Sequence, residues 1–538
     1  MIPEDVSTLP ASQNAALQWL QRVSVWVFDH WIALAAGSWL VSGLLYLTLP
    51  PSADQFMHAY TGWRLLEGDI PYRDFFDPNW PGVTGLHALA IALFGVNLWS
   101  WHAFDFLLFA ICALALADVA RLAAGRNAAK LSLMLLPLIY AGAGYWLAGQ
   151  HDMTASQFLA CALWFHVRAC QRRAIGWQLA TGLFIGAAML NKPTVGILIP
   201  LLLLQILWLE TPARAVIKHA VAMATGLLAA VLAAAGAVLL TGASAQDLID
   251  NVFTFNAYTQ FMDTPVYQRR DRIVVTWMVF REHVRWNWVL VLGSLPALFW
   301  IFRAGNRSIA STALPMLWLC GVVSCLVQSR GWPYHLSPSI VALAAMLPVS
   351  LAVVADGRVR FGRDTLGASV TIVFVALIAV GLGNRLVYLY GPVPKALASG
   401  QFDQQLSRFT ANDGLNLAES LGFVRRLAAR PPNECVLVVG TVSSINYLSQ
   451  RYQATHFYYF PVLYLTRPPL PMADRWVDLW EADLDKANCH FTLVADWVRT
   501  DWLNGTGRAA AALRQHLQAY RETGTLGAKG GMVIYERK

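Results

Sequence analysis

A succession of long apolar runs limits what this chain can fold into more than any other feature. Only 13% of the residues are charged, about half the share found in soluble domains. Runs able to cross a bilayer, which takes about 20 residues, lie near residues 31–49, 100–120, 131–148, 153–169, 176–190, 194–209, 216–240, 287–302, 310–327, 335–355 and 367–390. We therefore predict a polytopic α-helical membrane protein with about 11 to 13 transmembrane helices.

A shorter apolar run at residues 83–95 decides the expected topology. It is too short to cross comfortably. If it does not cross, and the N-terminus is inside, every inner loop carries Arg or Lys, as the positive-inside rule requires. The inner basic residues are then Arg121, Arg126, Lys130, Arg168, Arg172, Arg173, Arg214, Lys218, Arg303, Arg307, Arg358, Arg360 and Arg363. The net charge of +8 thus reflects topology and does not imply nucleic acid as a partner.

This topology divides the chain into three parts. We expect a cytoplasmic segment at residues 1–30 and a transmembrane domain at 31–394, whose first outer loop covers 50–99. An extracytoplasmic tail follows at 395–538. The unusual polar residues of the chain then all lie in outer segments, on one side of the membrane.

The tail has the sequence pattern of a small α/β domain. The runs ECVLVVG at 434–440 and CHFTLVADW at 489–497 are short and apolar, which is typical of buried parallel strands. Residues 413–430 and 507–521 have the spacing of helices.

Two cysteines, Cys435 and Cys489, each directly precede one of these predicted strands. Neighbouring parallel strands start at a similar height, so the two thiols can form a disulfide on an oxidising outer side. Two buried free thiols are the other interpretation, and both stay open.

The first outer loop begins with helix signals. Ser52 and Gln55 fit a capping box, apolar residues recur at helical spacing from Phe56 onward, and Gly68 is a stop signal. We predict a short helix in the membrane interface with Asp54 in its first turn, where exposed amides and the helix dipole favour an ionised carboxylate.

The same loop is rich in acidic residues. Asp54 lies just after the end of a span, beside His58, where an interfacial catalytic base has to be. Asp74 and Asp77 are further candidates for substrate contact. Glu67 and Asp69 are better explained as solvated loop charges.

A second acidic position lies in the turn GQHDM at 149–153, which holds His151 and Asp152. Asp before an apolar run is also a good helix N-cap, so a structural role remains an equal alternative. Together with Asp54 and His58, this pair can also form a divalent metal site, because carboxylate and imidazole suit several metals. No fixed ligand spacing supports that site.

Cations recur on the expected outer side. They are Lys192 in NKP, Arg269 and Arg270 in YQRRDR, and Arg330 with Tyr334 and His335 in SRGWPYH. Arg grips a phosphate with two hydrogen bonds and Lys acts on it as a point charge, so we expect these residues to hold a phosphate group. The alternative is that they reach out to the headgroups of membrane lipids.

The motif order carries a family likeness. An Asp follows the first span, then a helix, then G-x-x-PY-x-D-F-x-D-x-x-x-PG and an apolar segment ending in FG, over residues 68–95. This order resembles the GT-C superfamily of integral-membrane glycosyltransferases, in the bacterial branch related to protein mannosyltransferases and to the aminoarabinose transferase of lipid A. The resemblance implies that Asp54 is the base, Asp152 the second acidic position and Lys192 the lysine after a later span. Many relatives carry a basic residue before the proline pair, whereas this chain has DPNWPG at 77–82.

The resemblance implies an inverting glycosyltransferase that uses a polyprenyl-phosphate sugar and a hydroxyl of a glycan, lipid or protein acceptor. It would work on the outer face of a bacterial inner membrane, in the synthesis of cell-envelope glycans such as lipopolysaccharide. The alternatives are a membrane transporter and an O-antigen-type polymerase or ligase with a lipid diphosphate donor. A transporter would tend to show inverted repeats and charges at the membrane midplane.

Overall fold

The computed structural model of the chain describes residues 22–538 except 24, 210–212, 258–268, 304, 329–331, 360–364, 411–416, 441–442, 459–471 and 528–530. It divides into two compact units. The first contains residues up to Tyr46, Asp105–Leu232 and Arg269–Gly391, and the second contains Leu47–Phe104, Ala233–Gln268 and Pro392–Lys538.

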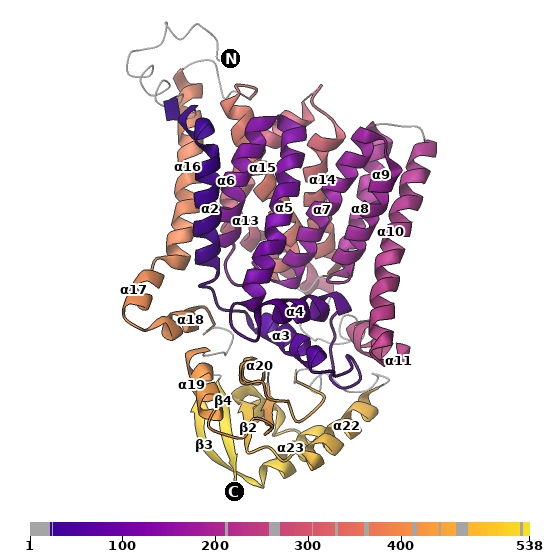
Figure 1. The fold of residues 1–538 in the computed structure, drawn as a ribbon, viewed down its shortest axis with the longest axis vertical. Coiled ribbons are helices and arrows are strands. Elements are labelled where there is room, and N and C mark those ends of the chain that lie inside the picture. The colour runs from indigo at the N-terminus through magenta and orange to yellow at the C-terminus, as the bar shows by residue number, and fades with distance from the viewer. Residues whose placement is uncertain are drawn as a thin grey trace. The chain divides into compact units, whose positions relative to one another are not determined.

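The first unit is a helical bundle (Figure 1), in which α7 packs on α8 and α15 packs on α6. Each helix is assigned here to the unit that contains most of its residues. The helices of the first unit are α2 Trp31–Tyr46, α5 Ser100–Ala124, α6 Arg126–Ala141, α7 His151–Arg172, α8 Ile175–Met189, η1 Pro193–Ile197, α9 Leu198–Leu209, α10 Ala213–Leu240, α13 Arg269–Phe302, α14 Ile309–Gln328, η4 Pro333–Leu336, α15 Ser337–Ala355 and α16 Thr365–Tyr390.

The helices confirm a polytopic helical protein. Within the described ranges, five helical stretches are long and apolar enough to cross a membrane, namely Ser100–Ala124, Val216–Leu240, Ile309–Gln328, Pro333–Ala355 and Ser369–Ala398. Shorter apolar helices accompany them, so the full number of spanning helices stays a prediction. One expected run is shorter than predicted, because α6 ends at Ala141 and residues 142–150 form turns, with Gly144 and Gly149 in the positive-φ region that glycine adopts without strain.

The second unit combines the first outer loop with the tail. Its elements are α3 Ala53–Leu66, α4 Pro81–Phe94, α11 Ala245–Leu248, η2 Ile249–Thr254, α17 Val393–Ala398, α18 Phe402–Thr410, α19 Leu417–Leu427, β1 Val436–Val439, α20 Ser444–Ser449, α22 Ala473–Lys486, β2 Phe491–Ala495, η6 Val498–Trp502, α23 Arg508–Leu517, β3 Tyr520–Leu526 and β4 Met532–Arg537.

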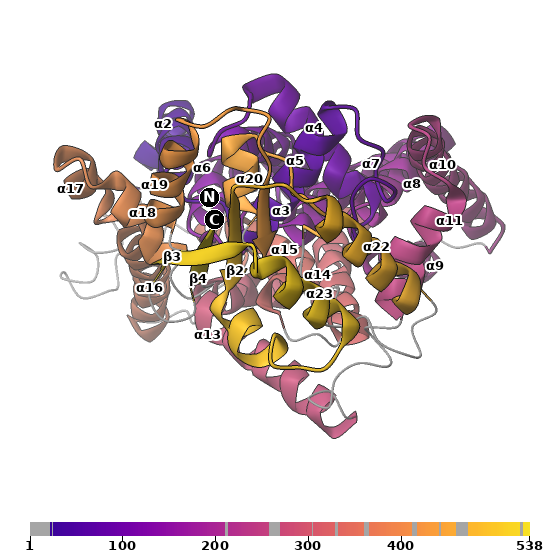
Figure 2. The same cartoon turned by 90° about the horizontal axis from the view of Figure 1, so that it is seen from below.

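The tail is an α/β domain, as predicted. Its sheet has the order β1-β2-β4-β3, and β1 pairs with β2 in parallel. Both strands are short apolar runs that are buried along their whole length. In Figure 2, α22 and α23 lie next to each other, and Trp480 Nε1 donates to Ala509 O across them at 3.0 Å. The hairpin of β3 and β4 was not predicted, and the expected helix 507–521 ends at Leu517 because β3 begins at Tyr520.

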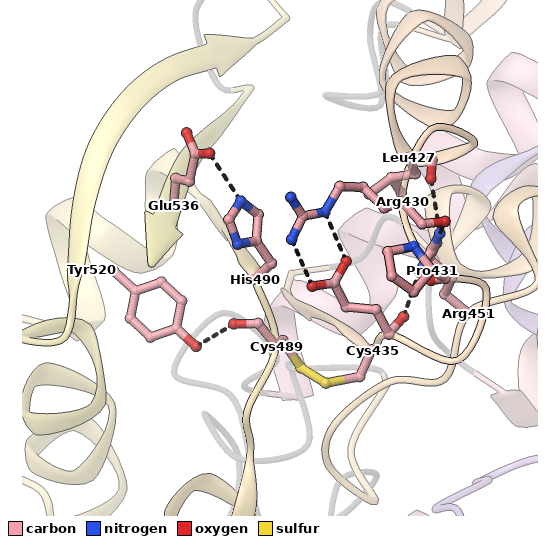
Figure 3. Close-up of polar contacts among 10 residues, drawn as sticks. Leu427, Arg430, Pro431, Cys435, Arg451, Cys489, His490, Tyr520 and Glu536 are labelled. Atoms are coloured by element: carbon pink, nitrogen blue, oxygen red, sulfur yellow. Dashed lines mark hydrogen bonds and ion pairs between the residues drawn. A yellow bond between two sulfur atoms is a disulfide. The ribbon is translucent and has the colours of Figure 1, made fainter. Parts of the chain in front are cut away.

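A disulfide joins Cys435 and Cys489 at the starts of β1 and β2, with the two Cα atoms 4.9 Å apart (Figure 3). The structure thus decides between the two interpretations of these cysteines. Next to it, Arg430 donates two bonds of 3.0 Å to the carboxylate of Glu434. These bonds hold the pKa of Glu434 below its usual range.

Helix α3 shares one hydrophobic core with the tail domain. The rings of Tyr60 and Tyr458 lie 5.4 Å apart, and those of Trp63 and Tyr452 lie 5.2 Å apart. The backbone N–H of Gln453 donates to the hydroxyl of Tyr60 at 2.8 Å. The aromatic residues that recur at helical spacing in the first loop are therefore core residues.

Helix α4 packs closely on α3. A Cβ on Gly62 would lie 2.7 Å from the backbone nitrogen of Ala88, so only glycine fits at this point of α3. The short apolar run at residues 83–95 forms most of α4, and its position against a membrane stays a prediction.

Candidate active site

The first group of predicted site residues gathers around Asp152. Helix α7 begins at His151 and places Asp152 in its first turn. The Nε2 atom of His151 lies 3.0 Å from Asp152 Oδ2, and Lys192 Nζ donates to the same oxygen at 3.2 Å. Asp152 is only 2% exposed. These neighbours favour its ionised form over a neutral one.

Lys192 reaches Asp152 because of the local sequence after α8. The helix ends at Met189, and Pro193 disfavours the helical conformation for the residue before it. Lys192 is accordingly extended, with φ −151° and ψ 98°, and Pro193 starts η1. An ammonium group has three donors, so Lys192 can hold Asp152 and still contact a phosphate oxygen.

The segment around Tyr334 completes this group. It forms the short helix η4, in which Tyr334 and His335 are buried. The Tyr334 ring lies edge-on to the His151 ring at 6.1 Å and stacks with Trp146 at 6.4 Å. His335 interacts electrostatically with Asp152. Three separate segments of the sequence, GQHDM, NKP and the end of SRGWPYH, thus form one cluster of polar side chains, which we call the Asp152 cluster.

The second group lies in the first outer loop and begins at Asp54. Ser52 is the N-cap of α3, and the predicted capping box with Gln55 is present. Gly68 follows the helix with φ +95°, as a helix stop requires. Asp54 is half-buried in the first turn. His58, one helical turn later, is buried with its ring 5.5 Å from that of His87.

The other two acidic candidates of the loop differ in their surroundings. Asp77 is buried and accepts bonds from Asn79 N–H at 2.9 Å and from the Thr84 hydroxyl at 2.7 Å. It therefore fixes the turn that enters α4. Asp74 is more exposed and pairs with Arg73 at 2.9 Å. Partial burial raises the pKa of Asp74, but bonds from Arg73 and from Ile70 N–H outweigh this and lower it.

The remaining predicted residues are the three arginines. Arg330 lies outside the described residues. Arg269 and Arg270 begin α13, but their side chains also lie outside the described part of the structure. The proposed contacts of these arginines stay predictions.

A metal site gets no support from the described residues. Nowhere among them do three or more His, Cys, Asp or Glu side chains gather as metal ligands would.

Sequence reasoning missed two ionisable residues inside the bundle, the buried Asp105 and the half-buried Arg385. Asp105 lies in α5 and bonds to side chains of three other helices, including Tyr46 in α2 at 2.7 Å. Arg385 in α16 donates to the backbone of the turn after α6, at Ala143 O with 3.1 Å. Both lie within long apolar runs. That position is itself a signal, because ionisable residues inside spans face the bundle interior and tend to be functional.

Comparison with known protein families finds a match to part of the chain. Residues 78–238 match the dolichyl-phosphate-mannose-protein mannosyltransferase family. The comparison with curated proteins found no match.

Two solved structures share the fold. ArnT from Cupriavidus metallidurans bound to undecaprenyl phosphate is 16% identical with a TM-score of 0.57, over 95% of this chain and 98% of ArnT. The oligosaccharyltransferase of Archaeoglobus fulgidus in its apo form is 11% identical with a TM-score of 0.52, over 94% of this chain and 74% of that protein. Part of the chain, residues 78–238, is thus similar to the dolichyl-phosphate-mannose-protein mannosyltransferase family, and the chain shares its fold with ArnT and with this oligosaccharyltransferase.

Proposed function

We propose that this chain transfers a sugar, with inversion, from a polyprenyl-phosphate donor to a hydroxyl group of a glycan, lipid or protein acceptor. The observation that carries the proposal is the Asp152 cluster, in which a buried carboxylate, a lysine and two histidines lie together. A site of this kind can orient an anionic headgroup and stabilise the phosphate that leaves. The similarity to ArnT, whose structure contains undecaprenyl phosphate, supports this class of donor.

The reaction needs one base and one cationic site for phosphate. The acceptor oxygen attacks the anomeric carbon, the bond from that carbon to the phosphate oxygen breaks, and polyprenyl phosphate leaves with the bond electrons. Asp54 takes the proton of the acceptor hydroxyl in this step. Lys192 contacts the phosphate, and Asp152 with His151 keeps the ammonium group of Lys192 in place. His58, Asp74, Asp77, Tyr334, His335 and the three arginines complete the substrate contacts.

We further propose that the reaction takes place on the outer face of a bacterial inner membrane. The basic residues of the expected inner loops support this orientation. The Cys435–Cys489 disulfide in the tail supports it independently, because disulfides persist in oxidising compartments and are rare in the cytosol. The N-terminus is then cytoplasmic, and the tail and first loop are extracytoplasmic.

Asp54→Asn tests the assignment of the base. In purified protein given polyprenyl-monophosphate sugars, we expect turnover to fall by about 10²- to 10⁴-fold, the usual contribution of a general base. Glu67→Gln is the matched control, because Glu67 is an exposed carboxylate at the other end of the same helix, and it should keep wild-type turnover. Wild-type turnover in Asp54→Asn would show that Asp54 is not the base. Activity with diphosphate donors alone would contradict the proposed donor class.

A further inference from the structure

A polar network lies inside the bundle where α2, α5, α6 and α7 meet. Asp105 on α5 has 0% exposure. Its Oδ2 accepts bonds from the hydroxyls of Tyr46 at 2.7 Å and of Tyr140, and its Oδ1 accepts from Gln157 Nε2 at 2.9 Å. Gln157 Nε2 also lies 3.0 Å from the Tyr140 hydroxyl. We call these four side chains the Asp105 network.

The network continues to the turn that carries the Asp152 cluster. The Tyr140 hydroxyl accepts a bond from the backbone N–H of Gly149 at 3.3 Å. Gly149 has φ +74° and stands three residues before Asp152. Tyr140 is in the last turn of α6, and Gln157 lies on α7 beyond Asp152. The network therefore holds the turn 142–150 at both of its ends.

A second set of bonds holds the start of the same turn. Arg385 on α16 donates to Ala143 O at 3.1 Å and to Gly142 O. The hydroxyl of Tyr390 donates to Ala141 O at 2.7 Å. Side chains from outside the turn thus hold the backbone at the end of α6 and after it, although the turn has no regular secondary structure of its own.

A carboxylate suits the centre of this network for a chemical reason. Two tyrosine hydroxyls and one amide all donate to Asp105, and a carboxylate is the side chain that only accepts. Asn at this position would replace one acceptor oxygen with a donor that faces a donating hydroxyl. A buried acidic residue in a span is also costly, and such residues tend to be functional.

We propose that Asp105 is a positioning residue, which holds the turn 142–150 through Tyr140 so that His151 and Asp152 face Lys192. Its effect on turnover rests on the proposed function, whereas its effect on the turn does not. The two effects can be measured separately.

The experiment compares Asp105→Asn with Asp118→Asn in the full chain in detergent micelles. Asp118 lies on the same helix α5 and likewise bonds to α7, through Trp164 Nε1 at 2.7 Å and through Arg168. It therefore controls for the loss of a carboxylate that joins these two helices. Amide hydrogen exchange is followed in peptides that cover residues 142–150, and turnover is measured with a polyprenyl-monophosphate sugar.

For Asp105→Asn we expect exchange at residues 142–150 to rise by about five- to tenfold, as for the loss of one or two hydrogen bonds, with the tail unchanged. We expect kcat to fall while the KM for the donor changes little. Asp118→Asn should leave exchange at residues 142–150 and kcat at wild-type values. Tyr140→Phe removes the hydroxyl that Asp105 and Gly149 share, and should reproduce the Asp105→Asn result.

Unchanged exchange at residues 142–150 in both Asp105→Asn and Tyr140→Phe would overturn the proposal. So would an equal rise in Asp118→Asn, because it would mark a general loosening of the bundle. If Asp105→Asn does not fold, Tyr140→Phe decides in the same way. Absence of transfer by the wild-type protein would refute the proposed function alone, since the exchange measurement still tests the role of Asp105.

Discussion

At the scale of single residues, Asp152 shows how a buried charge is kept in place. A carboxylate that is nearly out of contact with water costs several kcal/mol unless it is paired and hydrogen-bonded. Here Lys192 and His151 both contact Oδ2. Removing one partner is therefore more harmful than removing the pair, because the remaining charge is left buried without its partner.

This argument gives a prediction for Lys192. We expect Lys192→Met to lower the free energy of unfolding by about 3 kcal/mol, the usual cost of breaking a buried ion pair. The double variant Lys192→Met with Asp152→Asn should regain most of that loss. Thermal and denaturant unfolding of the full chain in detergent measures both. A double variant as unstable as Lys192→Met would contradict the explanation.

The sequence predicts the residues of the Asp152 cluster as site candidates, whereas it does not predict those of the Asp105 network. His151, Asp152, Lys192 and Tyr334 all stand at helix ends that the positive-inside pattern puts on one side, so one topology argument gathers them. Asp105 lies six residues into α5, within an apolar run, and its partners come from three other helices. Those contacts depend on how the helices pack, and the hydrophobic pattern does not specify packing.

At the scale of elements, the start of α3 connects the stability of a helix with the position of the proposed base. Its capping box satisfies backbone groups that would otherwise be left without partners at the N-terminus. The same turn carries Asp54, so a frayed helix start would displace the proposed base. Stability and activity are therefore expected to be lost together at this helix.

Ser52→Ala tests this connection. We expect it to cost about 1 kcal/mol of stability, as is typical for losing an N-cap, and to lower turnover. Ser244→Ala is the matched control, because Ser244 forms a capping box with Asp247 at the start of α11. It should cost a similar free energy and keep turnover. Turnover and thermal unfolding are measured for both variants. Equal turnover in the two would show that the position of Asp54 does not depend on the capping box, and would contradict the prediction.

The sequence predicted elements well where local signals act alone. Ser52, Gln55 and Gly68 define α3 without help from the rest of the chain, and the apolar strands β1 and β2 are equally clear. The hairpin of β3 and β4 was missed because YRETGTL is polar and largely exposed, and only its pairing with β4 makes it a strand. The early end of α6 was missed because Tyr145, Trp146 and Leu147 continue the apolar run through the turns.

At the scale of the whole molecule, the second unit joins parts of the chain that are far apart in sequence. The first loop, α11 and the tail form this unit together, and Arg475 on α22 pairs with Asp250 on η2. The disulfide connects β1 to β2 across 54 residues. It therefore restricts the unfolded tail as well as joining the folded one.

Removing the disulfide should show this contribution. We expect the double variant Cys435→Ala with Cys489→Ala to lose about 2–5 kcal/mol of stability, measured by unfolding of the full chain. Wild-type protein treated with reductant is the control and should behave like the double variant, which itself should not respond to reductant. Mass mapping without reductant should find the two peptides linked. Finding both thiols free would refute the disulfide.

The core that α3 shares with the tail also has a consequence for biosynthesis. Tyr60 receives its hydrogen bond from Gln453, which is 393 residues later in the chain. At about 5–20 residues per second, the ribosome makes that partner roughly 20–80 s after Tyr60. Until then the aromatic face of α3 has no tail domain to pack against. The loop that carries Asp54 therefore reaches its packed state only after the tail is synthesised. In a nascent or C-terminally truncated chain this loop lacks its packing partner.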